Sequence, residues 1–300
     1  RTRALSRRTL PLLNMAMRAS GNRRLVCLLG LILLGSPMLA LAALPRAASL
    51  TVCADQYLLG LADPAQIVAV SPDAADPNQS LFAAEAVRYP AHRGDSEELV
   101  ALQAELVLTD RWLPLRTSER LERLGIRVIQ LPLPDSWAEI AATTRTVAAA
   151  LGRPAQGEAR VAEMEAQLER LAARRLAARP PLAAYFLPDG GSAGAGTFID
   201  AVLQAAGTRN LATTLGLQGW GTFKLEQLAL AEPDLIIMGF FDQGGDTLRM
   251  AFARHPVFRR LLTRLPTIAV PDRYWICSGW FLAEAADYIA ERLPVPESVP

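Results

Sequence analysis

After the first 43 residues, the pattern of hydrophobic and polar positions divides the chain into three stretches. In the first stretch, short aliphatic runs alternate with segments in which apolar residues recur every three or four positions. The runs that predict strands are SLTVC (49–53), IVAVS (67–71), ELVLT (105–109) and IRVIQL (126–131). The segments that predict helices are 54–62, 95–103, 116–125 and 135–152, the last with Asp135 or Ser136 as its cap and Gly152 as its stop. Such alternation is typical of parallel α/β sheets.

The second stretch predicts one long amphipathic helix. Over Ala155–Ala178 the apolar positions Val161, Met164, Leu168 and Leu171 follow one another at steps of three, four and three. At ~1.5 Å per residue this helix is roughly 30 Å long, and two prolines at 180 and 181 end it.

The third stretch returns to the strand and helix alternation. Strands are predicted at 182–187, 234–240 and 267–270, and helices at 196–207, 255–265 and 281–293. We therefore expect an α/β protein of two lobes (44–152 and 180–300), each built on a parallel sheet and bridged by a single long helix (153–179). Ligands of open α/β sheets bind beyond the carboxyl ends of the strands, so a ligand cleft is expected between the lobes.

The beginning of the chain, residues 1–43, has the composition of a secretory signal peptide. It contains seven arginines and no acidic residue, then an 11-residue apolar run (Leu25–Gly35), then small residues with Ala40-x-Ala42 before the expected cleavage site. An apolar run of this length is about half of the ~20 residues that span a bilayer, so we expect export to the periplasm and not a retained anchor. The pair of arginines in SRRTLPL leaves the twin-arginine route open beside the general one.

Charge and cysteine content narrow the class further. Seven of the 31 Lys and Arg residues lie in the first 43 positions and all 30 Asp and Glu residues lie after them, so residues 44–300 carry a net charge near −6. Nucleic-acid binding, which needs clustered cations, is not expected. Cys53 and Cys277 follow predicted strands in opposite lobes, and three states stay open for them: a disulfide, two separate thiols that line the cleft, or ligands of a soft metal.

Six segments in order resemble periplasmic substrate-binding proteins of ABC importers for cobalamin and ferric siderophores. They are SLTVCADQYLLGLADPAQIVAVS (49–71), RGDSEELVALQAELVLT (93–109), LERLGIRVIQLP (121–132), GTFIDAVLQAAGTRNLA (196–212), KLEQLALAEPDLIIM (224–238) and VFRRLLTRLPTIAV (257–270). The resemblance implies capture of a metal chelate, a corrinoid or a ferric siderophore, and delivery to a membrane permease driven by its ATPase. It implies a monomer with no cofactor and no catalysis of its own. Glu97 and Glu226 match the glutamates that dock onto the permease in this family, although an acid in the first turn of a helix also complements the helix dipole.

The loops after the predicted strands supply the candidate ligand-binding residues. Aromatic faces suit a corrinoid or a catecholate chelate, and arginine suits a carboxylate or an anionic ferric chelate. Trp280 is assigned to the core, and Trp220, His92 and Arg93 each keep a purely structural alternative. The candidates are Cys53, Asp55, His92, Arg93, Trp220, Tyr274, Trp275 and Cys277.

Three rival functions are kept as alternatives. Heme could be bound through Tyr274, Tyr57 or His92, whereas a receptor for zinc or manganese is disfavoured because the chain has only two histidines. A serine hydrolase is the remote alternative, since GGSAG around Ser192 matches G-x-S-x-G and Asp234 and His255 follow in the order of a hydrolase triad.

Overall fold

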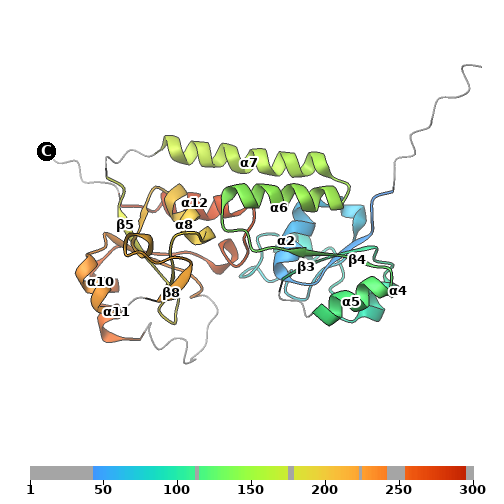
Figure 1. The fold of residues 1–300 in the computed structure, drawn as a ribbon, viewed down its shortest axis with the longest axis horizontal. Helices are drawn as coiled ribbons and strands as arrows, with labels where there is room; N and C mark the ends of the chain where they lie inside the picture. The colour runs from blue at the N-terminus through green and yellow to red at the C-terminus, as the bar shows by residue number, and fades with distance from the viewer. Residues whose placement is uncertain (1–42, 112–114, 175–178, 223–224, 242–253, 295–300) are drawn as a thin grey trace, which may run out of the picture. The chain divides into compact units, whose positions relative to one another are not determined.

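The computed structural model describes residues 43–111, 115–174, 179–222, 225–241 and 254–294. The chain divides into two parts, Arg1–Ala43 and Leu44–Pro300. Apart from Ala43, the predicted signal peptide lies outside the described residues and stays a prediction. Figure 1 labels the elements of the second part, to which the following description is confined.

The first lobe is built on a four-stranded parallel sheet in the order β2-β1-β3-β4. Its strands are β1 (Ala47–Ser49), β2 (Ile67–Ala69), β3 (Leu106–Asp110) and β4 (Arg127–Leu131). The strand predicted at 49–53 is wrong, because the strand ends at Ser49 and a helix begins at Val52. Thr51 caps that helix by accepting a hydrogen bond from the Ala54 N–H, so Val52 and Cys53 enter the helix instead of extending the strand.

Helices cover both faces of this sheet. They are α2 (Val52–Leu61), the short 3-10 turn η1 (Pro64–Gln66), α3 (Ala83–Ala86), α4 (Ser96–Ala101), α5 (Leu115–Arg123) and α6 (Trp137–Ala150). Ser136 caps α6 by accepting from the Glu139 N–H, and Gly152 follows its end at φ +71°, as the sequence predicts. The cap role therefore falls to Ser136 and leaves the Asp135 carboxyl for another contact.

The bridging helix is α7 (Pro154–Ala173), and its predicted apolar stripe is buried at Val161, Met164 and Leu171. It packs closely on α6, since a Cβ on Gly157 would lie 2.5 Å from the Ala148 Cβ. Side chains of α7 reach both lobes: Arg160 donates to the Gly60 carbonyl of the first and Gln167 to the Ala283 carbonyl of the second.

The second lobe repeats the architecture with a parallel sheet in the order β10-β9-β5-β7. Its strands are β5 (Leu182–Phe186), β7 (Arg209–Asn210), β9 (Leu235–Met238) and β10 (Thr267–Ala269). Its helices are α8 (Phe198–Ala205), α9 (Leu211–Thr214), α10 (Leu225–Ala231), α11 (Pro256–Arg264), the 3-10 turn η3 (Asp272–Tyr274) and α12 (Leu282–Ala290). An antiparallel pair of β6 (Gly191–Ala193) and β8 (Trp220–Thr222), which the sequence pattern did not predict, forms a separate two-stranded sheet.

Buried residues form one cluster shared by the lobes and one smaller cluster in each. In β3, Leu106 and Leu108 point to the shared cluster and Val107 to the cluster under α4 and α5, as the two-residue period of a strand requires. In β5, Tyr185 belongs to the shared cluster and Phe186 to the cluster that includes Phe258 of α11. The prediction of two parallel α/β lobes bridged by one long helix is confirmed. None of the described helices is both long and apolar enough to cross a membrane.

Candidate functional site

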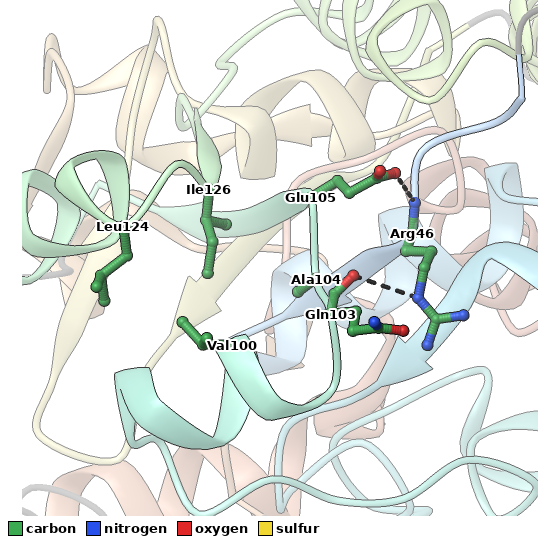
Figure 2. Close-up of a pocket in the computed structure, with 7 residues that line it drawn as sticks. All are labelled: Arg46, Val100, Gln103, Ala104, Glu105, Leu124 and Ile126. Atoms are coloured by element: carbon green, nitrogen blue, oxygen red, sulfur yellow. Dashed lines mark hydrogen bonds between the residues drawn. The ribbon is translucent and has the colours of Figure 1, made fainter.

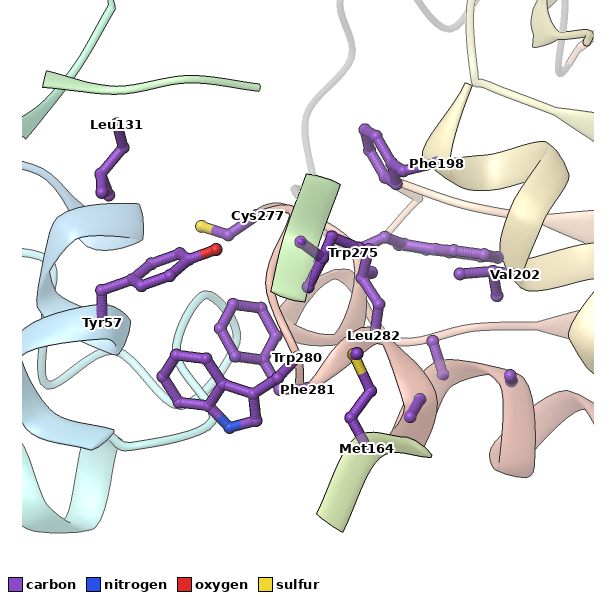
Figure 3. Packing of buried hydrophobic residues seen from close by; sticks show 14 of the residues in the cluster. Tyr57, Leu131, Met164, Phe198, Val202, Trp275, Cys277, Trp280, Phe281 and Leu282 are labelled. Atoms are coloured by element: carbon purple, nitrogen blue, oxygen red, sulfur yellow. The ribbon is translucent and has the colours of Figure 1, made fainter. Parts of the chain in front are cut away.

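The lobes meet in a packed aromatic seam (Figure 3). Tyr57 of α2 lies with its ring centroid 5.1 Å from that of Trp280 and 6.3 Å from that of Phe281, both edge to face. The Tyr57 hydroxyl donates to the Ser278 carbonyl at 3.1 Å, and burial raises the pKa of this phenol above its ordinary value. Trp280 is therefore core, as predicted, and Tyr57 is enclosed in the protein and cannot reach a heme iron.

Cys53 and Cys277 form a disulfide, with their Cα atoms 5.2 Å apart. The bond joins the beginning of α2 to the loop before α12, and Cys277 is 1% exposed within the shared cluster. Of the three states left open, the free thiols and the soft-metal ligands are wrong, because each sulfur is bonded to the other. The two cysteines are part of the connection between the lobes and do not contact a ligand as thiols.

Trp275 was predicted to face a ligand, and that prediction is wrong. Its side chain is fully buried, with its ring centroid 5.4 Å from that of Tyr185. Gly239, at the end of β9, makes room for this pair, since a Cβ there would lie 2.9 Å from the Trp275 Nε1. Trp275 is therefore part of the core of the second lobe, packed against Tyr185 of β5.

Tyr274 is half-buried, and its ring is in contact with other side chains of the protein. Its ring lies 5.3 Å from the ring of Tyr288 in α12, and the Arg273 guanidinium covers it at 4.9 Å. These contacts attach the loop after β10 to α12, and they supply a structural role for Tyr274. Its predicted ligand contact stays a prediction.

Asp55 was predicted to bind ligand, but its carboxylate is fully buried within the first lobe. It accepts hydrogen bonds from the hydroxyl of Ser49 and from the backbone and hydroxyl of Ser71, at 2.8 and 2.5 Å for the latter two. Burial raises the pKa of the Asp55 carboxyl, although these hydrogen bonds oppose the rise. Its role is to tie the end of β1 to the loop after β2.

His92 is likewise a structural residue, and the prediction that it contacts ligand is wrong. It is 3% exposed, its Nε2 lies 2.7 Å from the Ser49 carbonyl oxygen, and its Nδ1 accepts from the Gly94 N–H at 2.8 Å. Both ring nitrogens are thus engaged, which also removes this residue as a heme ligand. Arg93 beside it is exposed, its backbone N–H bonded to Glu98, and its predicted ligand contact stays open.

Trp220 is the predicted aromatic residue that the structure leaves accessible. It lies on β8 opposite Ala193 of β6, and 45% of it is exposed. Its indole meets the ring of Phe198, at the beginning of α8, edge to face with centroids 5.7 Å apart. Figure 1 shows β8 on the far side of the lobes from α7. Such a placement leaves an indole face open to a partner molecule.

From the first lobe, Asp135 approaches Phe198 and Arg111 approaches Asp135. Asp135 stands four residues after β4, just before α6, and Arg111 directly follows β3. The Phe198 backbone and the Arg111 guanidinium both lie near enough to the Asp135 carboxyl to influence its pKa. Burial raises the pKa of the Asp135 carboxyl and Glu139 adds to the rise, whereas the Phe198 N–H and the Arg111 charge oppose it. We call Arg111, Asp135, Phe198 and Trp220 the interlobe cluster.

Two members of the interlobe cluster were missed from the sequence. Asp135 was assigned as a possible helix cap, and Arg111 lies one residue beyond a strand whose following loop was not considered. The signal that could have found both is the rule that ligands collect at the carboxyl ends of parallel strands.

The two predicted docking glutamates lie in the first turns of α4 and α10. The Glu97 side chain is 74% exposed and forms an ion pair with Arg120 of α5. The Glu226 side chain lies outside what the structure describes. The docking role of both residues stays a prediction.

The hydrolase alternative fails on the placement of Ser192. This residue lies inside β6, is fully buried, and donates its hydroxyl to the Tyr185 carbonyl at 2.8 Å. A nucleophilic serine must stand exposed at a sharp turn between strand and helix. Asp234, the predicted partner, instead accepts from the Leu182 N–H at 2.6 Å.

A pocket lies elsewhere on the first lobe, away from the loops that follow the strands (Figure 2). It has a volume of 380 Å³ and is lined by Val100, Leu124 and Ile126, with Arg46 and Glu105 bonded to each other at its edge. Within the described residues, no group of three or more His, Cys, Asp or Glu side chains could hold a metal ion.

Comparison with known proteins agrees with this architecture. Residues 48–263 match the family model described as periplasmic binding protein. Proteins named cobalamin-binding protein from two strains of Halobacterium salinarum are each 31% identical over 147 residues. That stretch is 48% of this chain and spans only 40% of the length of those relatives.

Solved structures share the fold over most of the chain. The periplasmic heme-binding protein RhuT from Roseiflexus sp. RS-1 has a TM-score of 0.62 at 23% identity, covering 83% of this chain and 99% of that one. A periplasmic heme-binding protein from Pseudomonas aeruginosa has a TM-score of 0.65 at 20% identity, covering 86% and 96%. The vitamin B12-binding protein BtuF of Vibrio cholerae has a TM-score of 0.58 at 17% identity, covering 83% and 96%. With two parallel lobes bridged by α7 and a family match over most of its length, the chain belongs to the periplasmic binding protein family.

Proposed function

We propose that this protein is the exported solute-binding component of an ABC importer and that it captures a corrinoid between its lobes for delivery to the membrane permease. The observation that carries the proposal is Trp220, a half-exposed indole that meets Phe198 edge to face, where Asp135 of the other lobe approaches Phe198 and Arg111 approaches Asp135. An aromatic face beside a carboxylate and a guanidinium offers stacking to a wide apolar ring and hydrogen bonds to its polar rim. The names of the Halobacterium salinarum relatives support the choice of a corrinoid over a ferric siderophore.

The same geometry removes His92 and Tyr57, two of the three residues considered as ligands of a heme iron, and leaves Tyr274 as the third. Both histidines and all five tyrosines of the chain lie within the described residues. His92, Tyr57 and Tyr185 are buried, and Tyr288 donates its hydroxyl to the Ala269 carbonyl at 3.3 Å. The proposal assigns the protein no catalysis, a role in the periplasm, and Glu97 and Glu226 as its contacts with the permease.

Ligand screening tests the proposal. Cyanocobalamin is expected to raise the unfolding temperature of residues 44–300 and to quench their tryptophan fluorescence, because a ligand that binds only the folded state stabilises it. The Trp220→Ala variant should bind about tenfold more weakly or worse, since it loses the stacking face and its buried area, whereas Trp220→Phe should keep most of the affinity.

Ferric siderophores of the catecholate and hydroxamate classes and hemin form the other arms of the screen. Stabilisation by one of these and not by cyanocobalamin would replace the corrinoid by that chelate. If none of the ligands stabilised the protein, the proposed function would be wrong.

A further inference from the structure

The described residues include few large apolar side chains that are exposed, and three of them lie beside the two proposed docking helices. Val100 of α4 is 45% exposed, Leu124 directly after α5 is 48% exposed, and Leu230 of α10 is 84% exposed. From this placement we infer that each lobe docks onto the permease through a paired contact, an acidic residue and an aliphatic one a helical turn later. The inference rests on the proposed function and adds an apolar half to the docking surface.

In the first lobe, helical spacing brings the two kinds of side chain together. Val100 stands three positions after Glu97, and Leu124 stands four positions after Arg120, the residue that pairs with Glu97. Leu124 keeps helical geometry, because its N–H donates to the Arg120 and Leu121 carbonyls. Residues three and four apart are neighbours on a helix surface. An exposed ion pair is thus followed, one turn on, by Val100 and Leu124, two of the aliphatic side chains that line the pocket of Figure 2.

The second lobe carries the same order of residues on an unrelated segment. Leu230 stands four positions after Glu226 in α10, so the helical period places these two positions on one face. Leu228, between them, is 1% exposed and packs in the cluster under α10 and α11, which turns the face with Leu230 outward. In both helices the exposed aliphatic position thus follows the acidic position by about one turn, three residues in α4 and four in α10.

The partner that fits is a periplasmic loop of the permease with a basic side chain next to an aliphatic or aromatic one. The acidic residues Asp95, Glu97 and Glu98 at the beginning of α4 attract the basic group, which takes the place that Arg120 occupies in the free protein. An exposed ion pair of this kind is weak and screened by salt, so Arg120 gives way at little cost. The apolar neighbour enters the pocket of 380 Å³ on the side of Val100, Leu124 and Ile126, opposite its polar lining of Arg46, Gln103 and Glu105 (Figure 2).

The test measures association of the cyanocobalamin-loaded protein with the cell's own corrinoid permease and ATPase, reconstituted in lipid nanodiscs. Val100→Asp and Leu230→Asp should each weaken association about tenfold or more, as truncation or reversal at the centre of a contact does. Val87→Asp and Leu215→Asp are matched controls, because these residues are 70% and 41% exposed on the same lobes but belong to other segments, directly after α3 and α9. The double variant Glu97→Arg/Glu226→Arg measures how far association weakens when both acidic contacts are lost.

Cyanocobalamin affinity is measured in every variant and should not change. If Val100→Asp and Leu230→Asp associated as tightly as the unaltered protein, or if the control variants lost as much, the apolar half of the surface would be wrong while the proposed function stood. A protein that failed to bind any chelate would instead remove the proposed function, and the two failures are thereby distinct.

Discussion

At the scale of single residues, Asp55 is the best example of a charged group used for construction. Its carboxylate joins Ser49, the last residue of β1, to Ser71 after β2, and His92 bonds the same Ser49 through its carbonyl. Asp55, Ser71 and His92, which could have faced a ligand, are thus used to close the carboxyl edge of the first sheet. These hydrogen bonds fix the carboxyl edge of the sheet. Arg111 and Asp135 follow β3 and β4 at the same edge.

The burial of Asp55 predicts a sign for the pH dependence of stability. Burial raises the folded-state pKa of this carboxyl above its unfolded value of about 3.9, so the folded protein holds the proton to higher pH than the unfolded chain does. Its contribution to the free energy of unfolding is therefore greatest below pH ~4 and falls as pH rises through the raised pKa. We expect the difference in unfolding free energy between the unaltered protein and Asp55→Asn to shrink as pH rises above about 4, measured by denaturant titration at several pH values.

Asp76→Asn is a control, because the contribution of Asp76 to the free energy of unfolding should depend on pH in the opposite direction. Hydrogen bonds from Gln79 and Asn78 lower the pKa of its exposed carboxyl, so its contribution is lost as pH falls through the lowered pKa. A difference for Asp55→Asn that stayed constant or grew with pH would mean that the hydrogen bonds from the serines outweigh burial.

At the scale of elements, the hydrophobic pattern predicted most helices and strands, but not which loop side chains point outward. Trp220 and Trp275 both follow glycine-rich or polar turns near strand ends, yet one is 45% exposed and the other fully buried. What separates them is the three-residue pairing of β6 with β8 and the space left by Gly239, neither of which has a period that a sequence can display. A position directly after a strand therefore predicts the sheet edge at which a residue lies, but it does not predict whether the side chain is exposed to a ligand.

The packing of α2 against the second lobe gives a prediction at this scale. A Cβ on Gly60 would lie 2.4 Å from the Cζ2 of Trp280 and 3.3 Å from the Cζ of Phe82, and Trp280 is itself enclosed by Tyr57 and Phe281. Alanine favours a helix over glycine by about 1 kcal/mol, but overpacking costs about 1–3 kcal/mol, and the enclosed ring cannot move aside. Gly60→Ala should therefore lower the free energy of unfolding by up to about 2 kcal/mol in denaturant titration.

A double-mutant cycle identifies the cause. If the clash with the indole is responsible, Gly60→Ala combined with Trp280→Phe should be less destabilised than the sum of the two single variants. Strict additivity would point to a different origin.

At the scale of the whole described molecule, the lobes are joined by more than the bridging helix that the sequence predicts. One apolar cluster contains residues of both sheets, of α2 and α6, and of α7, α8 and α12. The disulfide between Cys53 and Cys277 adds a covalent connection across the same seam. The cysteine pairing could not be decided from the sequence, because the beginning of α2 and the loop before α12 approach each other only after the lobes have packed. This construction favours a site held at a fixed separation over one that closes through a large hinge motion.

Two features connect the lobes, the shared apolar cluster and the disulfide, and removing the disulfide shows which of them couples the unfolding of the two lobes. Cys53 and Cys277 are 224 positions apart, and closing a loop of that length stabilises a fold by up to about 5 kcal/mol through the unfolded chain. Cys53→Ser/Cys277→Ser, or reduction of the unaltered protein, should therefore lower the free energy of unfolding by about 3–5 kcal/mol. Because the shared cluster remains, unfolding should still occur in one cooperative transition, with affinity for the ligand within about threefold of the oxidised protein. Two separate transitions, or loss of ligand binding on reduction, would show instead that the disulfide is what holds the lobes in register, and that the aromatic seam alone is too weak to do so.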